Sequence, residues 1–124
     1  MTADNLNEFQ RGYVECALWT YDGNDGENDI AIEDFDSATI EQMIKDCKQF
    51  YQDNARNLIR LFENQSVPYS RSQAGHDFWL TRNRHGSGFW DRGLGVTGEH
   101  LTRKAEILKE VSLYIGEGGL IYAE

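Results

Sequence analysis

The chain has 124 residues, of which 40% are hydrophobic and 12% aromatic, enough for a compact core in one domain spanning residues 1–124. Its 21 acids and 12 bases give a net charge of −9, which argues against direct nucleic-acid binding and against an anionic-membrane binder. No apolar run reaches the roughly 18 residues of a membrane span, and the N-terminus lacks the basic start of a signal peptide, so we expect a soluble cytoplasmic protein.

The first predicted element is a strand over residues 13–21. This stretch follows Gly12 and is rich in aromatic and β-branched side chains, which favour strands. Residues 22–26 combine Asp, Gly and Asn, which is typical of a turn. Cys16 and Cys47 do not form the close pair that zinc or redox sites use. We therefore expect two reduced, buried thiols.

A long amphipathic helix is predicted from about Ser37 to Asn64. Its apolar residues recur with the i, i+3, i+4, i+7 spacing of one helix face. Asp36, Ser37 and Thr39 are candidate N-caps. The predicted helix is long for so small a domain, and we expect a bend or break near residues 53–54.

The second half of the chain is predicted to form short strands and one helix, separated by loops. A loop covers residues 65–77, a strand residues 78–82, a glycine-rich loop residues 83–95, a second helix residues 97–110 and a β-hairpin residues 112–122. The predicted class is α+β, with a small, mostly antiparallel sheet packed against the long helix. The open edge of the terminal hairpin makes a homodimer plausible.

Residues 75–93, here called the arginine–tryptophan segment, carry the most specific chemistry. Arginine supplies donors for phosphate or carboxylate, and tryptophan supplies a flat apolar face. Glycine allows a close backbone approach to a ligand. The predicted ligand- or partner-binding residues are Trp79, Arg82, Arg84, His85, Trp90 and Arg92.

The same segment has a purely structural interpretation. Trp79 and Trp90 would then anchor the core, while Asp77 and Asp91 would pair with the arginines. An enzymatic interpretation instead assigns His85 the role of a general acid or base, because histidine titrates near neutral pH. The histidines lack the spacing of a helical metal site, and neither a metal nor a cofactor is predicted.

An acidic patch is the second candidate surface. Residues 1–53 hold 13 acids and 3 bases, whereas residues 54–124 hold 8 acids and 9 bases. The acids concentrate at Asp22, Asp25, Glu27, Asp29, Glu33, Asp34 and Asp36. Such a patch could imitate the DNA backbone in the basic groove of a host enzyme, although a mimic needs its acids spread over a longer surface.

Four stretches resemble small acidic proteins of unknown function that bacteriophages and related mobile elements encode. They are RGYVECALWT, IEQMIKDCKQFYQDN, GHDFWLTRNRHGSGFWDRGLG and SLYIGEGGLIYAE. The resemblance spans most of the chain and carries over no catalytic residue. It implies a phage accessory protein acting in a bacterial cytoplasm.

These observations favour a protein that binds a host or phage partner without catalysis, as proteins that inhibit or evade host machinery do. One alternative is a small enzyme or sequestering protein for a nucleotide-like anion, with Arg82, Arg84 and Arg92 binding its charge. The other alternative is the acidic DNA mimic.

Overall fold

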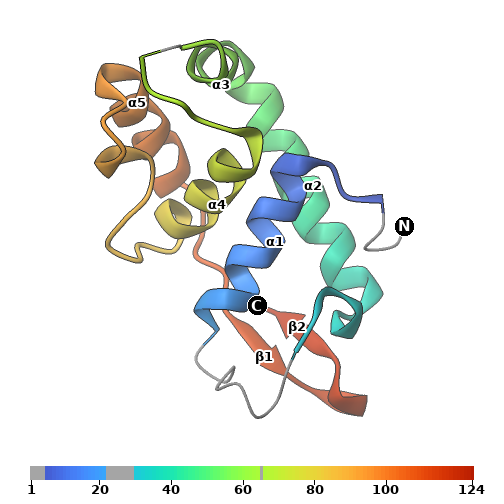
Figure 1. Cartoon of the computed structure of the whole chain (residues 1–124). Coiled ribbons are helices and arrows are strands. Elements are labelled where there is room, and N and C mark those ends of the chain that lie inside the picture. The colour runs from blue at the N-terminus through green and yellow to red at the C-terminus, as the bar shows by residue number, and fades with distance from the viewer. Residues whose placement is uncertain (1–4, 22–29, 65) are drawn as a thin grey trace.

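The computed structural model describes residues 5–21, 30–64 and 66–124, and most of them are helical (Figure 1). The α-helices are α1 (Glu8–Thr20), α2 (Ser37–Asp53), α3 (Ala55–Phe62), α4 (Arg71–Arg82) and α5 (Gly95–Glu106). Short 3-10 turns are η2 (Ile32–Asp34), η3 (Phe89–Asp91) and η4 (Glu117–Gly119), and the strands are β1 (Leu113–Ile115) and β2 (Ile121–Ala123). The predicted α+β class, with a sheet packed against one long helix, is therefore wrong. The predicted turn at residues 22–26 lies outside the described residues.

Residues 13–20 belong to helix α1, not to the predicted strand. Asn7 caps this helix, and the side chain of Gln10 returns a hydrogen bond to the Asn7 backbone in a capping box. Tyr13, Cys16 and Ala17 are all buried, which matches the spacing of a helix face. The aromatic and β-branched content that favoured a strand is outweighed by this packing, because strand propensity depends strongly on context.

The long helical region follows the prediction closely. The side chain of Asp36 accepts from the Thr39 backbone and begins α2. The break between α2 and α3 falls at Asn54, within the predicted region. Asn54 is buried, and its side-chain amide donates to the carbonyl of Phe50 at 2.9 Å. This side-chain bond competes with the regular helical ladder and marks the joint.

Residues 71–82 form helix α4. The prediction of a loop up to residue 77 and of a strand at residues 78–82 is therefore wrong. Ser70 caps α4 by accepting from the Gln73 backbone. Its second half is buried on nearly every side, including the polar residues Asp77, Thr81 and Arg82. A helix enclosed in this way shows no clear polar and apolar faces in its sequence, so its periodicity is weak.

The C-terminal elements agree better with expectation. Helix α5 begins at Gly95 and ends at Glu106, somewhat earlier than predicted, and buries Leu101 and Ala105. β1 and β2 form the predicted antiparallel hairpin, with Tyr114 opposite Tyr122. Phe35 adds an isolated parallel bridge to β2 at Ile121.

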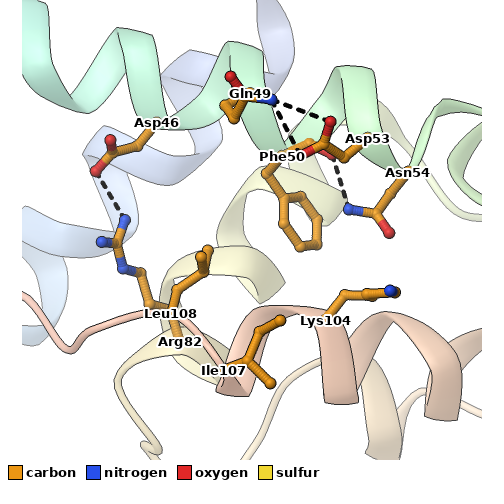
Figure 2. Close-up of a pocket in the computed structure, with 9 residues that line it drawn as sticks. All are labelled: Asp46, Gln49, Phe50, Asp53, Asn54, Arg82, Lys104, Ile107 and Leu108. Atoms are coloured by element: carbon orange, nitrogen blue, oxygen red, sulfur yellow. Dashed lines mark hydrogen bonds and ion pairs between the residues drawn. The ribbon is translucent and has the colours of Figure 1, made fainter.

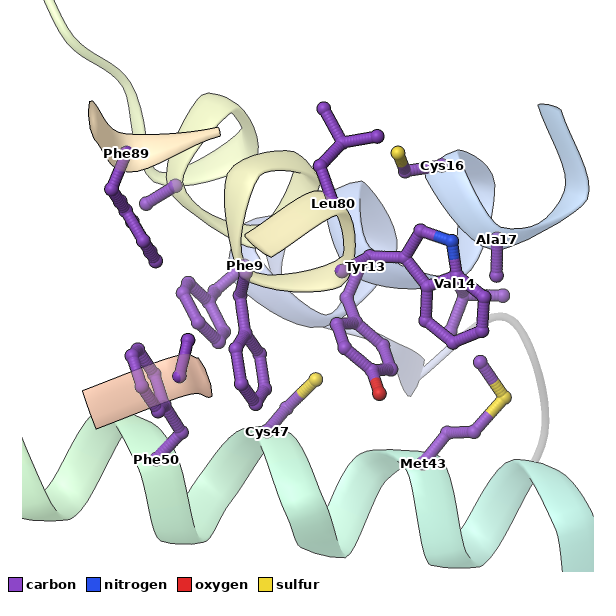
Figure 3. Packing of buried hydrophobic residues seen from close by; sticks show 14 of the residues in the cluster. Phe9, Tyr13, Val14, Cys16, Ala17, Met43, Cys47, Phe50, Leu80 and Phe89 are labelled. Atoms are coloured by element: carbon purple, nitrogen blue, oxygen red, sulfur yellow. The ribbon is translucent and has the colours of Figure 1, made fainter. Parts of the chain in front are cut away.

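An aromatic cluster holds α1, α2, α4 and η3 together (Figure 3). The rings of Phe50 and Phe78 stack with centroids 4.0 Å apart, and Tyr13 lies 4.9 Å from Phe78. Phe89 of η3 extends the stack at 6.0 Å from Phe50. Stacked and edge-on rings stabilise a core beyond the area that they bury. The arginine–tryptophan segment is thus built onto the core.

Both cysteines are free and buried, as predicted. Burial raises the pKa of the Cys16 thiol to about 12 and raises the pKa of Cys47 well above its ordinary 9.0. Burial also raises the pKa of Tyr13 and of Tyr69. All four groups therefore stay protonated in the folded chain at pH values where they ionise in the unfolded chain.

The stability that these four groups contribute is therefore expected to be full below about pH 9 and to be lost as the pH rises from there toward about 12. The folded chain binds more protons than the unfolded chain over this window, so deprotonation favours unfolding. Urea unfolding at about pH 7.5 and about pH 10.5 measures the loss. A Cys16→Ala, Cys47→Ala double variant should lose less over the same interval. Equal urea midpoints at the two pH values would contradict the prediction.

Candidate functional site

The arginine–tryptophan segment folds back on itself between α4 and η3. The backbone N–H of Phe89 donates to Thr81 Oγ1 at 3.2 Å, and the backbone N–H of Gly88 donates to Asp91 Oδ1 at 3.0 Å. Gly88 has φ of 153°, and a Cβ there would collide with the Thr81 side chain. Only glycine fits this position, which explains one of the glycines in the segment.

Arg92 forms an ion pair with the buried carboxylate of Asp77. Its Nη2 donates to Asp77 Oδ1 at 2.9 Å, and its Nε reaches the same oxygen at 3.1 Å. The Tyr69 hydroxyl donates to Asp77 Oδ2 at 2.6 Å. The hydrogen bond to Asp77 raises the pKa of Arg92, against a smaller opposing effect of burial. Since Asp77 is fully buried, this network fastens η3 to α4.

Arg82 is also held inside the protein. Its Nη1 donates to Asp46 Oδ2 at 2.8 Å and to the Tyr13 hydroxyl at 3.2 Å, and its Nε donates to the Lys109 carbonyl at 2.7 Å. Burial by itself would lower the pKa of Arg82, but the interactions with Tyr13 and Asp46 raise it overall. Arg82 thus connects α4 to α1, to α2 and to the chain after α5.

Trp79 is a core anchor. Its ring is 3% exposed and meets Tyr13 edge-on, with centroids 5.2 Å apart. The indole N–H donates to Thr20 Oγ1 at 2.8 Å, which satisfies its one polar atom. The structural interpretation of the segment therefore fits Trp79 and the Asp77–Arg92 pair, whereas Arg82 is buried but pairs with Asp46 of α2 and not with Asp77 or Asp91.

The other three predicted site residues lie at the surface. Arg84 is exposed, and its Nε donates to Glu110 Oε1 at 3.1 Å. His85 is exposed and borders a small cavity of about 170 Å³, which neither Arg84 nor Trp90 lines. Trp90 is 51% exposed although both of its neighbours in the chain are anchored. The segment therefore divides into an inner half that builds the fold and an outer half that faces solvent.

The acidic patch is described only in part. Asp22, Asp25, Glu27 and Asp29 lie outside the described residues. Asp34 accepts from the Ala31 backbone at 2.8 Å, and Asp36 caps α2. Glu33 is exposed. Two of the three described acids therefore have a local structural role.

Within residues 5–21, 30–64 and 66–124, no three His, Cys, Asp or Glu side chains are grouped to hold a metal. His76 packs its ring against Trp19 with centroids 5.7 Å apart, and its Nδ1 is buried with no hydrogen-bond partner in the described structure. Burial lowers the pKa of His76.

Two larger cavities flank the Asp46–Arg82 ion pair, and sequence reasoning did not find them. One measures about 300 Å³ and is lined by the second half of α2 and the end of α5, including Phe50, Lys104 and Ile107 (Figure 2). The other measures about 410 Å³ and is lined by the first half of α2, by residues 109–111 and by the chain end. Both combine segments far apart in the sequence, so no local motif marks them.

Comparison of the chain with family models, with curated proteins and with solved structures found no match. None of the helices in the described part of the chain has the length and apolar character needed to cross a bilayer.

Proposed function

We propose that this chain is a phage accessory protein that binds a host or phage protein in the bacterial cytoplasm, and that it inhibits or evades host machinery by binding without catalysis. The observation that carries the proposal is the half-exposed indole of Trp90 in a rigid setting. The phage context rests on the sequence resemblance described above.

The neighbours of Trp90 hold it in place. Phe89 is fully buried and its backbone is bonded to Thr81, while Arg92 is paired with buried Asp77. A surface whose backbone is already ordered loses less conformational entropy on binding than a loop that must first be ordered. Tryptophan is enriched among the few residues that carry most of the affinity of protein interfaces. These features support Trp90 as an anchor for a partner protein.

Arg84, His85 and Val96 are further exposed side chains that lie within a few residues of η3 in the sequence. Arg84 and His85 follow α4, and exposed Val96 lies in the first turn of α5, which packs on η3. Exposed arginine and apolar side chains are of the kinds found in the core and rim of interfaces. The proposal includes Arg84, His85 and Val96 among the residues that contact the partner protein.

The enzyme and sequestration alternatives have less support. Two of the arginines proposed to bind an anion already form ion pairs, Arg82 with Asp46 and Arg92 with Asp77. Arg84 is exposed and paired with Glu110. The mimic alternative rests mainly on acids outside the described residues, and a homodimer through the hairpin edge stays a prediction.

The proposal is tested with a photo-crosslinking amino acid placed at position 90 in the chain expressed in host cells. The crosslinked protein is identified by mass spectrometry, and its affinity for the purified chain is then measured by calorimetry. Trp90→Ala should weaken binding about 30-fold or more, the effect expected for an interface hot spot, with an unchanged circular dichroism spectrum. Trp19→Ala, which removes another exposed indole, should change the affinity less than about twofold.

Full affinity in the Trp90→Ala variant would overturn the proposed surface. Loss of binding only when Glu33 and the other acids of the patch are reversed to lysine would favour the mimic instead. Arg84→Ala and His85→Ala are expected to weaken binding less than Trp90→Ala, because charged residues at an interface rim contribute little.

A further inference from the structure

Strand β1 has one side that no described backbone covers. In the described ranges the sheet consists of β1 and β2 alone. The outer side of β2 is occupied, because the Asp36 N–H donates to the Ile121 carbonyl at 2.9 Å beside the Phe35 bridge. No described residue does the same for β1, and the hairpin lies at the end of the molecule opposite α3 (Figure 1). An open strand edge of this kind is a template for another strand.

The hydrogen bonds of the hairpin show which main-chain groups of β1 are unused. Ser112 and Glu124 donate to each other's carbonyl at 3.0 Å. In an antiparallel pair such residues alternate with residues whose N–H and C=O groups point away from the partner strand. Tyr114, two residues after Ser112, therefore faces β2, whereas Leu113 and Ile115 direct their main-chain groups to the open side. Neither of these two N–H groups donates to a backbone acceptor in the described structure.

The side chains along this edge are exposed and uncharged. Tyr114 is 43% exposed and Ile115 is 44% exposed. The Tyr114 ring stacks on Tyr122 of β2 with centroids 5.6 Å apart. Residues 111–116 carry no charged side chain, although the whole chain has a net charge of −9. Proteins protect open strand edges from pairing with lysine or proline, and β1 has neither.

A second copy of β1 pairs with every outward group of this edge. In an antiparallel arrangement about a two-fold axis at Tyr114, Leu113 of each copy lies opposite Ile115 of the other copy. The two copies then exchange about four main-chain hydrogen bonds. The cross-strand side-chain pairs are aliphatic on one face and aromatic on the other, and such pairs stabilise antiparallel sheets.

The neighbouring registers are poorer. An axis at Leu113 would place Ile115 opposite Val111, whose N–H already donates to the Asn83 side chain at 2.7 Å. An axis at Ile115 would place Leu113 opposite Glu117, where the strand has ended. The edge therefore offers its outward groups over the three residues of β1, and a strand of the same length pairs them completely. This match in length and register favours a second copy over a longer strand from another protein.

We propose that two copies of this chain form a two-fold dimer in which β1 pairs with β1, so that the two hairpins make one continuous antiparallel sheet with Tyr114 at the axis. The interface contains none of the residues assigned to the Trp90 surface, and either proposal can fail without the other.

Sedimentation equilibrium of the full chain between about 10 µM and about 500 µM measures the dimer. Ile115→Lys places a charge on the strand edge and should raise the dissociation constant of the dimer at least tenfold. Val96→Lys is the matched control, because Val96 is also an exposed β-branched residue but lies in α5, and it should change the constant less than twofold. Circular dichroism checks that both variants are folded.

Two cysteine variants test the register. Tyr114→Cys places two thiols opposite each other at the axis, where the Cα atoms are about 4.5 Å apart, within the range that a disulfide spans. Ile115→Cys is the control, because it lies opposite Leu113 of the partner subunit and more than about 7 Å from its own copy. Under mild oxidation Tyr114→Cys should form a covalent dimer at least tenfold faster than Ile115→Cys. The natural thiols of Cys16 and Cys47 are buried and contribute equally to both variants.

Three results would overturn the proposal. The first is a monomer over the whole concentration range, which would leave the open edge to a strand of another protein. The second is a dimer that Ile115→Lys leaves as tight as the wild type, which would place the interface elsewhere. The third is an equal rate of crosslinking in the two cysteine variants. If Ile115→Lys does not fold, the comparison of Tyr114→Cys with Ile115→Cys decides by itself.

Discussion

The Asp77→Ala variant is expected to lose about 3–5 kcal/mol of folding free energy, the cost of removing one member of a buried ion pair. Asp77 is fully buried, and the change would leave the Arg92 guanidinium with only the more distant Asp91 carboxylate, at 3.8 Å, and the Tyr69 hydroxyl without its acceptor. Uncompensated buried polar groups account for most of the loss. The melting temperature should fall by roughly 10–20 °C.

Urea unfolding of the wild type and the variant measures this loss. Arg84→Ala is the control, because it removes an ion pair of exposed side chains, and it should cost less than about 1 kcal/mol. Equal stabilities for Asp77→Ala and the wild type would mean that the Asp77–Arg92 network does not hold η3 against α4.

The Gly75→Ala variant is expected to be less stable than the wild type by about 1–3 kcal/mol, the range for overpacking a close contact. Helix propensity by itself predicts the opposite sign, because alanine is the better helix former by about 1 kcal/mol. A Cβ at Gly75 would collide with the Phe9 carbonyl, and one at Gly12 would collide with the Ser72 carbonyl. These atoms belong to backbones of α1 and α4, so relief requires the two helices to move apart.

Thermal unfolding monitored by circular dichroism checks this prediction. Gly86→Ala is the control, because Gly86 has φ of 81° with no atom near its Cβ position. It reports the cost of a left-handed backbone without a collision, about 1 kcal/mol. A Gly75→Ala variant more stable than the wild type would show that the α1–α4 crossing tolerates a methyl group.

Residue types singled out the arginine–tryptophan segment, but they could not separate its structural residues from its exposed ones. Trp79, Arg82 and Arg92 build the fold, whereas Arg84, His85 and Trp90 face outward. Residue type does not distinguish a paired arginine from a free one, because the partner Asp46 comes from a distant helix. The two cavities beside the Asp46–Arg82 pair escaped prediction for the same reason.

The sequence by itself determined the elements whose signals are local. The α2 N-cap at Asp36, the break near Asn54, the C-terminal hairpin and the buried free thiols all followed from residue spacing, capping chemistry and turn composition. Tertiary structure decided α1 and α4. Gly12 and Gly75 let these two helices cross closely, and Phe78, Asp77 and Arg82 are enclosed in α4. Because α4 is covered on nearly every side, it carries no polar stripe, and its helical state depends on contacts with residues far along the chain.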